Sequence, residues 1–187
     1  MRADRQRNQS RILDAAREQI SAAGPDVSME QIAKAAGVAV GTLYRHYPTK
    51  HDLVRAVYLQ LSATLIEEAQ VAAAGIESPG DAMRGILRLM TDFVDRAAVN
   101  RGVKAAAEAL GTQAVDDDLQ ITGRSALDTL VATAVADGDL RPTVTVSDFY
   151  LLMSSVPGDL AKPARDRWLQ IVVDGLSAGP SRGPAPR

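Results

Sequence analysis

The sequence predicts an all-α protein of about nine helices, and three observations support this fold class. Apolar residues recur at helical spacing along most of the 187-residue chain. Residues that cap helices stand before several of these stretches, and no alternating apolar pattern is long enough to form a strand. Hydrophobic residues make up 46% of the chain but aromatic residues only 4%. The core must therefore consist mainly of aliphatic side chains, which suit packed helices.

The first helix is predicted over residues 9–23, where one face is apolar. Its inward residues are Ile12, Leu13, Ala16 and Ile20. Gly24 and Pro25 end this helix. Residues 1–8 are polar and charged, and we expect this segment to be mobile.

Residues 28–47 predict two short helices joined at a glycine. Ser28 and Gln31 stand at the two positions of a capping box. Gly37 stands where the first helix must end and the chain must turn, and a second helix follows over residues 40–47. This layout is typical of a helix-turn-helix, whose second helix enters the major groove of DNA.

Around this segment the chain carries an ordered set of short motifs. They are Arg11-Ile12-Leu13-Asp14-Ala15-Ala16, Ile32-Ala33, Ala36-Gly37-Val38, Gly41-Thr42-Leu43-Tyr44-Arg45-His46-Tyr47 and Lys50-x-x-Leu53. In these motifs and their order the chain resembles the TetR family of bacterial transcriptional repressors. Tyr47 departs from the family pattern, in which phenylalanine is commoner at this position. Beyond about residue 60 the resemblance is limited to the helical layout.

The resemblance implies two domains, and the composition of the last residues predicts a tail. Residues 1–48 would form the helix-turn-helix DNA-binding domain, and residues 49–178 a ligand-binding and dimerisation domain. Residues 179–187 are rich in glycine and proline, and we expect a disordered tail.

A long helix is predicted to link the two domains, from its cap Thr49 to about residue 74, with Asp52 at the capping-box position. The next helix is predicted to start at Ser78, with Asp81 closing a second box. Thr145 and Asp148 form a third pair of this kind. The helices predicted after the long one cover residues 78–98, 102–110, 116–136, 145–156 and 163–176.

Composition and charge exclude several classes of protein. The chain has no cysteine, so disulfides and thiolate metal sites are excluded. Its net charge is −2, but basic residues outnumber acidic ones in residues 1–55, and the local field decides attraction to phosphates. The longest apolar runs, such as residues 130–136, are too short to span a bilayer. With no signal peptide visible either, we expect a cytoplasmic protein without membrane contact.

Candidate DNA-binding residues lie on the helix predicted over residues 40–47. Thr42 and His46 are four residues apart and share a face, and Tyr44 and Arg45 project to either side of it. Their polar groups suit phosphates and base edges, and Gly41 allows a close approach. The alternative is a polar helix face that is simply solvated.

The family resemblance assigns roles within this set. It implies that Tyr44 and Lys50 contact phosphates, while Thr42 and the residues near Val40 and Arg45 face bases. Ser28 is expected to cap its helix, to contact the DNA backbone, or both. The candidate DNA-binding residues are Ser28, Val40, Gly41, Thr42, Tyr44, Arg45, His46 and Lys50.

No catalytic constellation is visible, and we expect neither an enzyme nor a cofactor. His46 and His51 lack carboxylates at metal-ligand spacing, so no metal site is expected. The acidic run at 116–118 lacks the pattern of a calcium loop and suits a helix N-terminus better.

By the same resemblance, an effector pocket should lie among the middle helices of the second domain. Met90, Phe93, Tyr150 and Met153 are the candidate ligand-binding residues, because Met and aromatic side chains line adaptable apolar pockets. The alternative is that they only pack the core. No basic residue is obvious on the inward stripes, so we expect a small hydrophobic ligand that is neutral or weakly polar. The residues that could overturn this expectation are Arg84, Arg88, Arg101, Lys104 and Arg124.

The last two helices carry apolar stripes that could close a four-helix interface with a second copy. These stripes are Phe149, Leu152, Met153 and Val156 on the eighth helix, and Trp168, Leu169, Val172, Val173 and Leu176 on the ninth. The alternative is that both stripes complete the core of the monomer.

Together these features predict a homodimeric repressor that a small hydrophobic ligand releases from a palindromic double-stranded operator. Ligand binding would favour another orientation of the long helix and so change the spacing of the two recognition helices. One alternative is a helical ligand carrier or enzyme with a vestigial DNA-binding head. Another is a regulator that needs no ligand.

Overall fold

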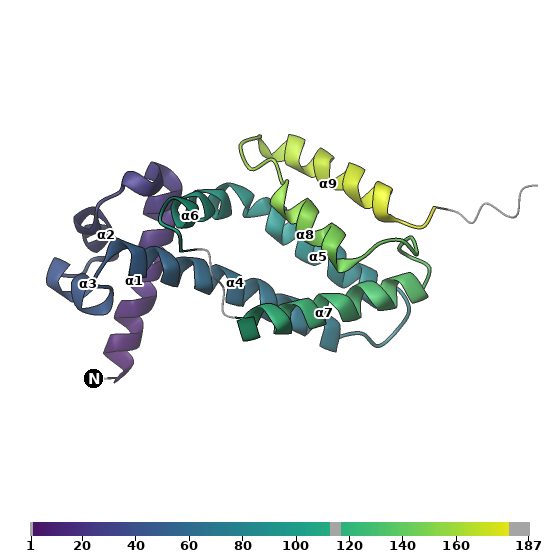
Figure 1. Cartoon of the computed structure of the whole chain (residues 1–187), viewed down its shortest axis with the longest axis horizontal. Coiled ribbons are helices and arrows are strands. Elements are labelled where there is room, and N and C mark those ends of the chain that lie inside the picture. Colours follow the sequence, from purple (N-terminus) through teal and green to yellow (C-terminus); the bar gives the residue numbers. More distant parts are fainter. Residues whose placement is uncertain (1, 113–116, 180–187) are drawn as a thin grey trace, which may run out of the picture. The chain divides into compact units, whose positions relative to one another are not determined.

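The computed structural model describes the backbone of residues 2–112 and 117–179, and their side chains except at 2–6, 98–100 and 117–120. Over these residues the prediction of an all-α fold is confirmed (Figure 1). The helices are α1 Arg2–Ala23, the short 3-10 helix η1 Gly24–Asp26, α2 Met29–Ala36, α3 Val40–His46, α4 Lys50–Ala74, α5 Asp81–Asp95, α6 Ala97–Ala109, α7 Asp117–Ala136, α8 Val146–Ser154 and α9 Lys162–Leu176. The tail predicted over residues 179–187 lies outside the described residues except for Gly179.

The chain forms two compact units. The first unit contains Met1–Ala63 and Ala98–Val115, and the second contains Thr64–Ala97 and Asp116–Arg187. The division falls within α4 and assigns most of α6 to the first unit. The domain boundary predicted after residue 48 is a functional boundary. The packing of the helices does not test it, so it stays a prediction.

The predicted helix boundaries are wrong at three places in the chain. Helix α1 begins at Arg2, where the sequence suggested a mobile segment. No glycine or proline interrupts residues 2–23 and several residues in 2–8 favour helix, so the polar start simply extends it. Helix α5 begins at Asp81 instead of Ser78, because Gly80 has φ 84°, in the left-handed region. The Asp81 carboxylate still accepts from the backbone N–H of Ser78 at 2.7 Å.

The third place is the break between α5 and α6. Helix α5 ends at Asp95 and α6 begins at Ala97, where we predicted a helix to residue 98 and another from 102. No glycine or proline marks this break. A long-range ion pair marks it instead, since the Arg96 guanidinium lies 2.8 Å from the Glu68 carboxylate of α4. Sequence periodicity cannot reveal such a partner.

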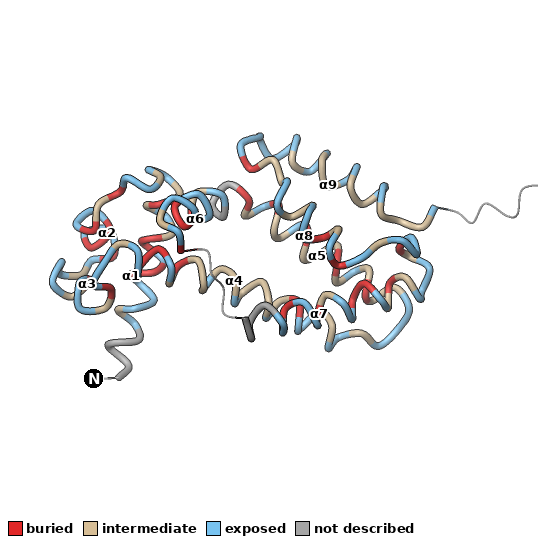
Figure 2. The backbone as a smooth tube through the Cα atoms, viewed as in Figure 1, coloured by how far each residue is buried: buried red, intermediate tan, exposed pale blue. Residues whose placement is uncertain are grey.

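The first unit has a closed aliphatic core. Its fully buried large side chains come from α1, α2, α3, α4 and α6 (Figure 2). They are Ile12, Ile20, Ile32, Leu43, Leu53, Val54, Val57 and Val103. Gly102 brings α6 close to α1, because a Cβ atom added there would lie 2.9 Å from Ser21 Cα.

The second unit is built mainly on α5, α7 and α8. Leu130, Leu140 and Phe149 are buried in its core cluster. Helix α9 packs against α5 but buries none of its residues fully. An ion pair between Lys162 Nζ and Asp95 Oδ1, 2.6 Å apart, joins the two helices.

Two other predictions concern the helix caps and membrane-spanning helices. The caps predicted at Thr49 and Thr145 are confirmed, since Asp52 and Asp148 accept their backbone N–H groups at 3.1 and 2.7 Å. Among the residues that the structure describes, no helix combines the length and apolar character needed to cross a bilayer.

Candidate nucleic-acid interface

The turn between α2 and α3 forms as the sequence predicts. Ser28 Oγ accepts the backbone N–H of Gln31 at 3.2 Å, and Gln31 Oε1 accepts that of Ser28 at 2.7 Å, which completes the capping box. Gly37 has φ 64° and its N–H donates to the Lys34 carbonyl at 3.1 Å. Since non-glycine residues rarely adopt this conformation, Gly37 fixes how the chain enters α3.

Arg11 supports the same turn from α1. Its Nη2 donates to the Gly37 carbonyl at 3.3 Å. A Cβ atom added to Gly37 would lie only 2.5 Å from this Nη2. The sequence singled out Arg11 as part of a family motif but not as a partner of the turn, because no local pattern links two residues 26 positions apart.

Helix α3 is anchored on one side and exposed on the other. Leu43 is fully buried in the first core cluster, and buried Tyr47 ends the helix. Burying a leucine side chain contributes about 1.5–3 kcal/mol, which is a substantial anchor for a helix of two turns. On the outer side Val40 is 38% exposed and Tyr44 42% exposed. The helix therefore presents a fixed outer face to a partner.

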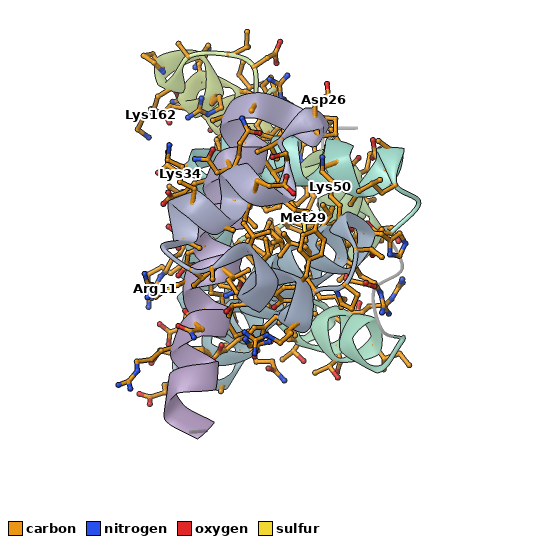
Figure 3. All side chains as sticks on the ribbon, turned by 90° about the vertical axis from the view of Figure 1, so that its left-hand side faces the viewer. Arg11, Asp26, Met29, Lys34, Lys50 and Lys162 are labelled. Atoms are coloured by element: carbon orange, nitrogen blue, oxygen red, sulfur yellow. The ribbon has the colours of Figure 1, made fainter. Side chains whose placement is uncertain are left out.

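Gly41 and Arg45 lie on this exposed face, while Thr42 and His46 are half-buried. A Cβ atom added to Gly41 would meet nothing within 4 Å. Lys50 is half-buried at the start of α4, close to the turn that carries Asp26, and Figure 3 shows it on the other side of the unit from Arg11 and Lys34.

Several candidate donors already hold acceptors within the chain. Arg45 Nε donates to the Gly41 carbonyl at 3.1 Å, and its Nη2 donates to Thr42 Oγ1 at 3.2 Å. Lys50 Nζ donates to the Pro25 carbonyl. These acceptors are neutral and solvent lies nearby, so an anionic phosphate can replace them.

Tyr44 has a charged partner that no sequence pattern predicts. Its hydroxyl donates to Glu30 Oε1 at 3.4 Å. The backbone N–H of Glu30 itself, then the hydroxyls of Ser28 and Tyr44, hold the pKa of the Glu30 carboxyl below its ordinary value. Glu30 and Tyr44 are 14 positions apart on different helices, so no spacing rule could have paired them.

The four candidate ligand-binding residues do not form one group. Met90 is buried in the core cluster of the second unit, and Met153 packs against that cluster. Phe93 is half-buried and outside the cluster, and Tyr150 is 46% exposed. Their role in binding stays a prediction.

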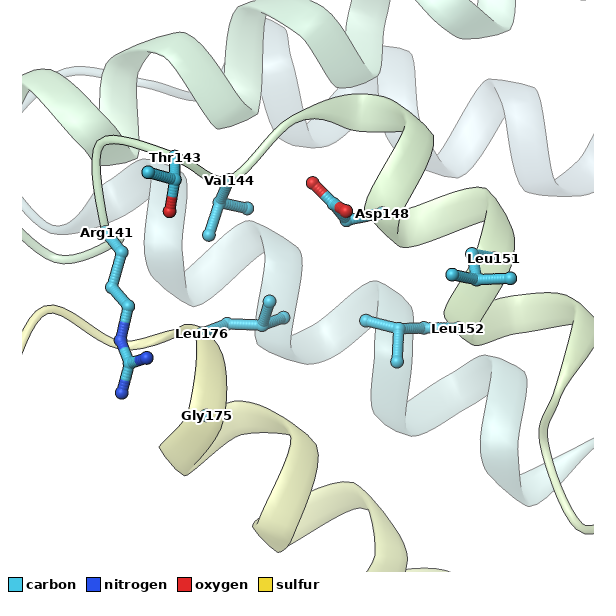
Figure 4. Close-up of a pocket in the computed structure, with 8 residues that line it drawn as sticks. All are labelled: Arg141, Thr143, Val144, Asp148, Leu151, Leu152, Gly175 and Leu176. Carbon is cyan, nitrogen blue, oxygen red and sulfur yellow. The ribbon is translucent and has the colours of Figure 1, made fainter.

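The second unit has an open hollow of about 270 Å³ at the ends of α8 and α9 (Figure 4). It is lined by Arg141, Thr143, Val144, Asp148, Leu151, Leu152, Gly175 and Leu176. None of the candidate ligand-binding residues lines it. Its charged groups hold partners, since Arg141 Nε donates to the Ser177 carbonyl at 3.1 Å and Asp148 caps α8. This hollow is therefore distinct from the predicted effector pocket.

The two stripes predicted for a dimer interface are only partly available. Phe149 is buried in the second unit, and Met153, Leu169, Val172 and Leu176 pack against the same core. These contacts favour the alternative that the stripes complete the monomer core, and the interface itself stays a prediction. The other stripe residues, Leu152, Val156, Trp168 and Val173, are half-buried. Leu151 and Ile171 are exposed by 67% and 56% on the same helices.

Among the described residues, no group of three or more His, Cys, Asp or Glu side chains could hold a metal ion. Of the acidic run at residues 116–118, Asp116 lies outside the description and only the backbone of the other two is described.

Two family models match this chain. Residues 12–57 match the model of bacterial regulatory proteins of the tetR family. Residues 78–178 match the C-terminal domain of SbtR-like transcriptional regulators. The first match spans α3 with its exposed face, and the second spans α5 to α9.

Individual proteins resemble the chain over different lengths. The HTH-type transcriptional regulator UidR of Escherichia coli K12 is 41% identical over 61 residues, and the match covers 32% of this chain and 31% of that regulator. The chain thus spans about a third of the length of the first curated relatives it matches. The HTH-type transcriptional repressor KstR of Rhodococcus jostii RHA1 is 31% identical over 156 residues, which cover 75% of this chain and 68% of KstR.

A solved structure extends the likeness over nearly the whole chain. The TetR transcription regulatory protein of Mycobacterium vanbaalenii superposes with a TM-score of 0.71 at 31% identity. The superposition covers 94% of this chain and 98% of that one.

Proposed function

Because the chain belongs to the TetR family of bacterial regulatory proteins, we propose that it is a transcriptional repressor that binds operator DNA and is released by a small molecule. The observation that carries the proposal is the outer face of α3. Leu43 anchors this helix, while Val40, Gly41 and Tyr44 face solvent. A recognition helix needs this combination of a fixed position and a free face.

In the complex, α3 would lie in the major groove. Thr42 and the residues near Val40 and Arg45 would face base edges, with Gly41 allowing a close approach. Tyr44, Lys50 and Ser28 would contact phosphates, and His46 would lie at the edge of the contact. Arg45, Tyr44 and Lys50 would exchange their present acceptors for those on DNA.

We further propose that the protein acts as a homodimer through α8 and α9. A palindromic operator requires two recognition helices about 34–36 Å apart, which a two-fold dimer supplies. Exposed Leu151 and Ile171 would be covered by the second copy, together with the half-buried residues of the two stripes. Acting on chromosomal DNA would require a cytoplasmic location.

The effector would be a small hydrophobic molecule held in the second unit near Met90 and Met153. Its binding would shift the population toward an orientation of α4 that moves the recognition helices off their spacing. Helix α4 suits this role because its residues belong to both units.

The test is binding of a labelled duplex followed over a range of salt concentrations. We expect Tyr44→Phe and Lys50→Ala to weaken binding to every sequence, as loss of a phosphate contact does. Thr42→Ala and Arg45→Ala should instead change the preference among sequences. An equal loss for all four variants on all sequences would contradict this division of roles.

The same measurement addresses the alternative of a ligand carrier or enzyme with a vestigial head. Such a protein would show no retention on heparin or random duplex DNA that weakens steeply with salt.

A further inference from the structure

Glu30 lies among groups that are predicted to bind the DNA backbone. It is an exposed residue in the first turn of α2, two positions after the cap Ser28. The Tyr44 hydroxyl donates to its Oε1, and its own backbone N–H and then the Ser28 hydroxyl lower the pKa of the Glu30 carboxyl. Tyr44 and Ser28 are two of the three proposed phosphate contacts.

A carboxylate and a phosphate compete for the same donors. Both are anionic oxygen acceptors, and both are favoured at the N-terminus of a helix, where unpaired backbone N–H groups point outward. Ser28 Oγ already accepts the N–H of Gln31, so its own hydroxyl proton is free to be donated. The donors around Glu30 are therefore of the kind that binds a phosphate oxygen.

We propose that the Glu30 carboxylate holds, in the free protein, the place that a backbone phosphate takes in the DNA complex, and so weakens binding to every DNA sequence. This inference rests on the proposed DNA-binding function and names a residue that tunes it. Glu30 does not itself bind DNA in this proposal. It acts through the donors of Tyr44 and Ser28 and is therefore a positioning residue.

The geometry fits an exchange rather than a permanent contact. The Tyr44–Glu30 distance of 3.4 Å is longer than a strong O–H···O hydrogen bond. Glu30 is exposed, so its side chain can swing into solvent when a phosphate arrives. Its negative charge then remains near the DNA backbone and repels it, whatever the base sequence.

The decisive comparison is between Glu30→Gln and Glu18→Gln. Both changes remove one negative charge from the first unit, and Glu18 is an exposed residue of α1 outside the proposed DNA contacts. Each full-length variant is titrated against a fluorescent duplex of random sequence at several salt concentrations. We expect Glu30→Gln to bind roughly three- to tenfold more tightly than the natural chain at low salt, against less than about twofold for Glu18→Gln. The difference should shrink as salt rises.

Two further variants separate this role from a purely structural one. In a Tyr44→Phe background, the gain from Glu30→Gln should fall, because the two residues act on one contact. The Glu30→Ala variant should also bind DNA more tightly, and its loss of thermal stability should be too small to unfold the first unit. An unchanged gain in the Tyr44→Phe background would overturn the coupling.

Equal effects of Glu30→Gln and Glu18→Gln on a protein that binds DNA would overturn this inference and leave the proposed function standing. A natural chain that binds no duplex even at low salt would overturn the proposed function, and this inference with it.

Discussion

The two units differ in how completely they bury their apolar side chains. Among the described residues of the first unit, α1, α2, α3, α4 and α6 enclose eight fully buried large residues, and the exposed face of α3 carries Val40, Gly41, Tyr44 and Arg45. In the second, α9 buries no residue fully, and Leu151 and Ile171 remain exposed. Close approach at glycines does not account for the contrast, since a Cβ atom added to Gly102 in the first unit or to Gly123 in the second would lie within 3 Å of its neighbours.

The two units therefore differ in whether their own helices cover their apolar side chains. In the first unit, the unit's own helices cover the large apolar side chains of the core, and the outer face of α3 is the one proposed to contact DNA. The second leaves large apolar side chains in water, which supports an additional protein partner there. The predictions that follow test this difference, beginning with the largest effect.

The core of the first unit should be the most sensitive region. We expect Leu43→Ala to destabilise the protein by about 2–5 kcal/mol, because the cavity lies in a closed core. Urea denaturation followed by circular dichroism measures this loss. Val71→Ala is the control, since Val71 is 65% exposed on α4 and surface changes cost less than about 0.5 kcal/mol. Similar losses for both variants would contradict a closed core around α3.

The exposed residues of the second unit should matter for assembly. We expect the double change Leu151→Glu and Ile171→Glu to raise the dissociation constant of the dimer at least about a hundredfold, since both carboxylates would be buried by the partner. Analytical ultracentrifugation gives the monomer fraction directly. Val71→Glu, on an equally exposed valine outside α8 and α9, should leave assembly unchanged. If the double variant stays dimeric, the interface lies elsewhere.

Substitutions at two glycines should distinguish an effect on stability from an effect on DNA binding. Gly41 in α3 and Gly175 in α9 both have open space at the Cβ position and no positive φ. We expect Gly41→Ala and Gly175→Ala each to stabilise the protein by about 0.5–1 kcal/mol through helix propensity. Only Gly41→Ala should weaken DNA binding, because its methyl group stands on the face proposed to approach DNA. Thermal melts and duplex titrations of both variants check this, and equal DNA affinity would remove Gly41 from the contact.

The smallest effect should come from the two matching caps, one in each unit. The Thr49 and Thr145 side chains are the main groups that hold the pKa values of Asp52 and Asp148 below the ordinary 3.8. A lowered pKa in the folded state means that this stability is complete above the unfolded value and is lost as the pH falls through the folded one.

We therefore expect Asp52→Asn and Asp148→Asn to flatten the fall in stability below about pH 5, by similar small amounts. Asp159→Asn, in an exposed loop, serves as the control. Melting temperatures between pH 3 and pH 7 provide the measurement. A much larger effect in one unit would show that the units differ in their caps as well as in their burial.

The sequence by itself determined the helical class, the capping boxes at Ser28, Thr49 and Thr145, and the turn at Gly37. These features depend on residues within four positions of one another, so local spacing is enough to predict them. The family resemblance followed from the same local motifs, and the family matches confirm it.

Only the tertiary structure decided which distant groups meet. It paired Tyr44 with Glu30, Arg11 with Gly37 and Arg96 with Glu68, and it packed α6 into the first unit. It also determined how deeply the side chains of α9 are buried in the core of the second unit. The physical reason is that side-chain contacts depend on how helices pack and rotate against one another, and helical periodicity specifies which face is apolar without specifying its partner.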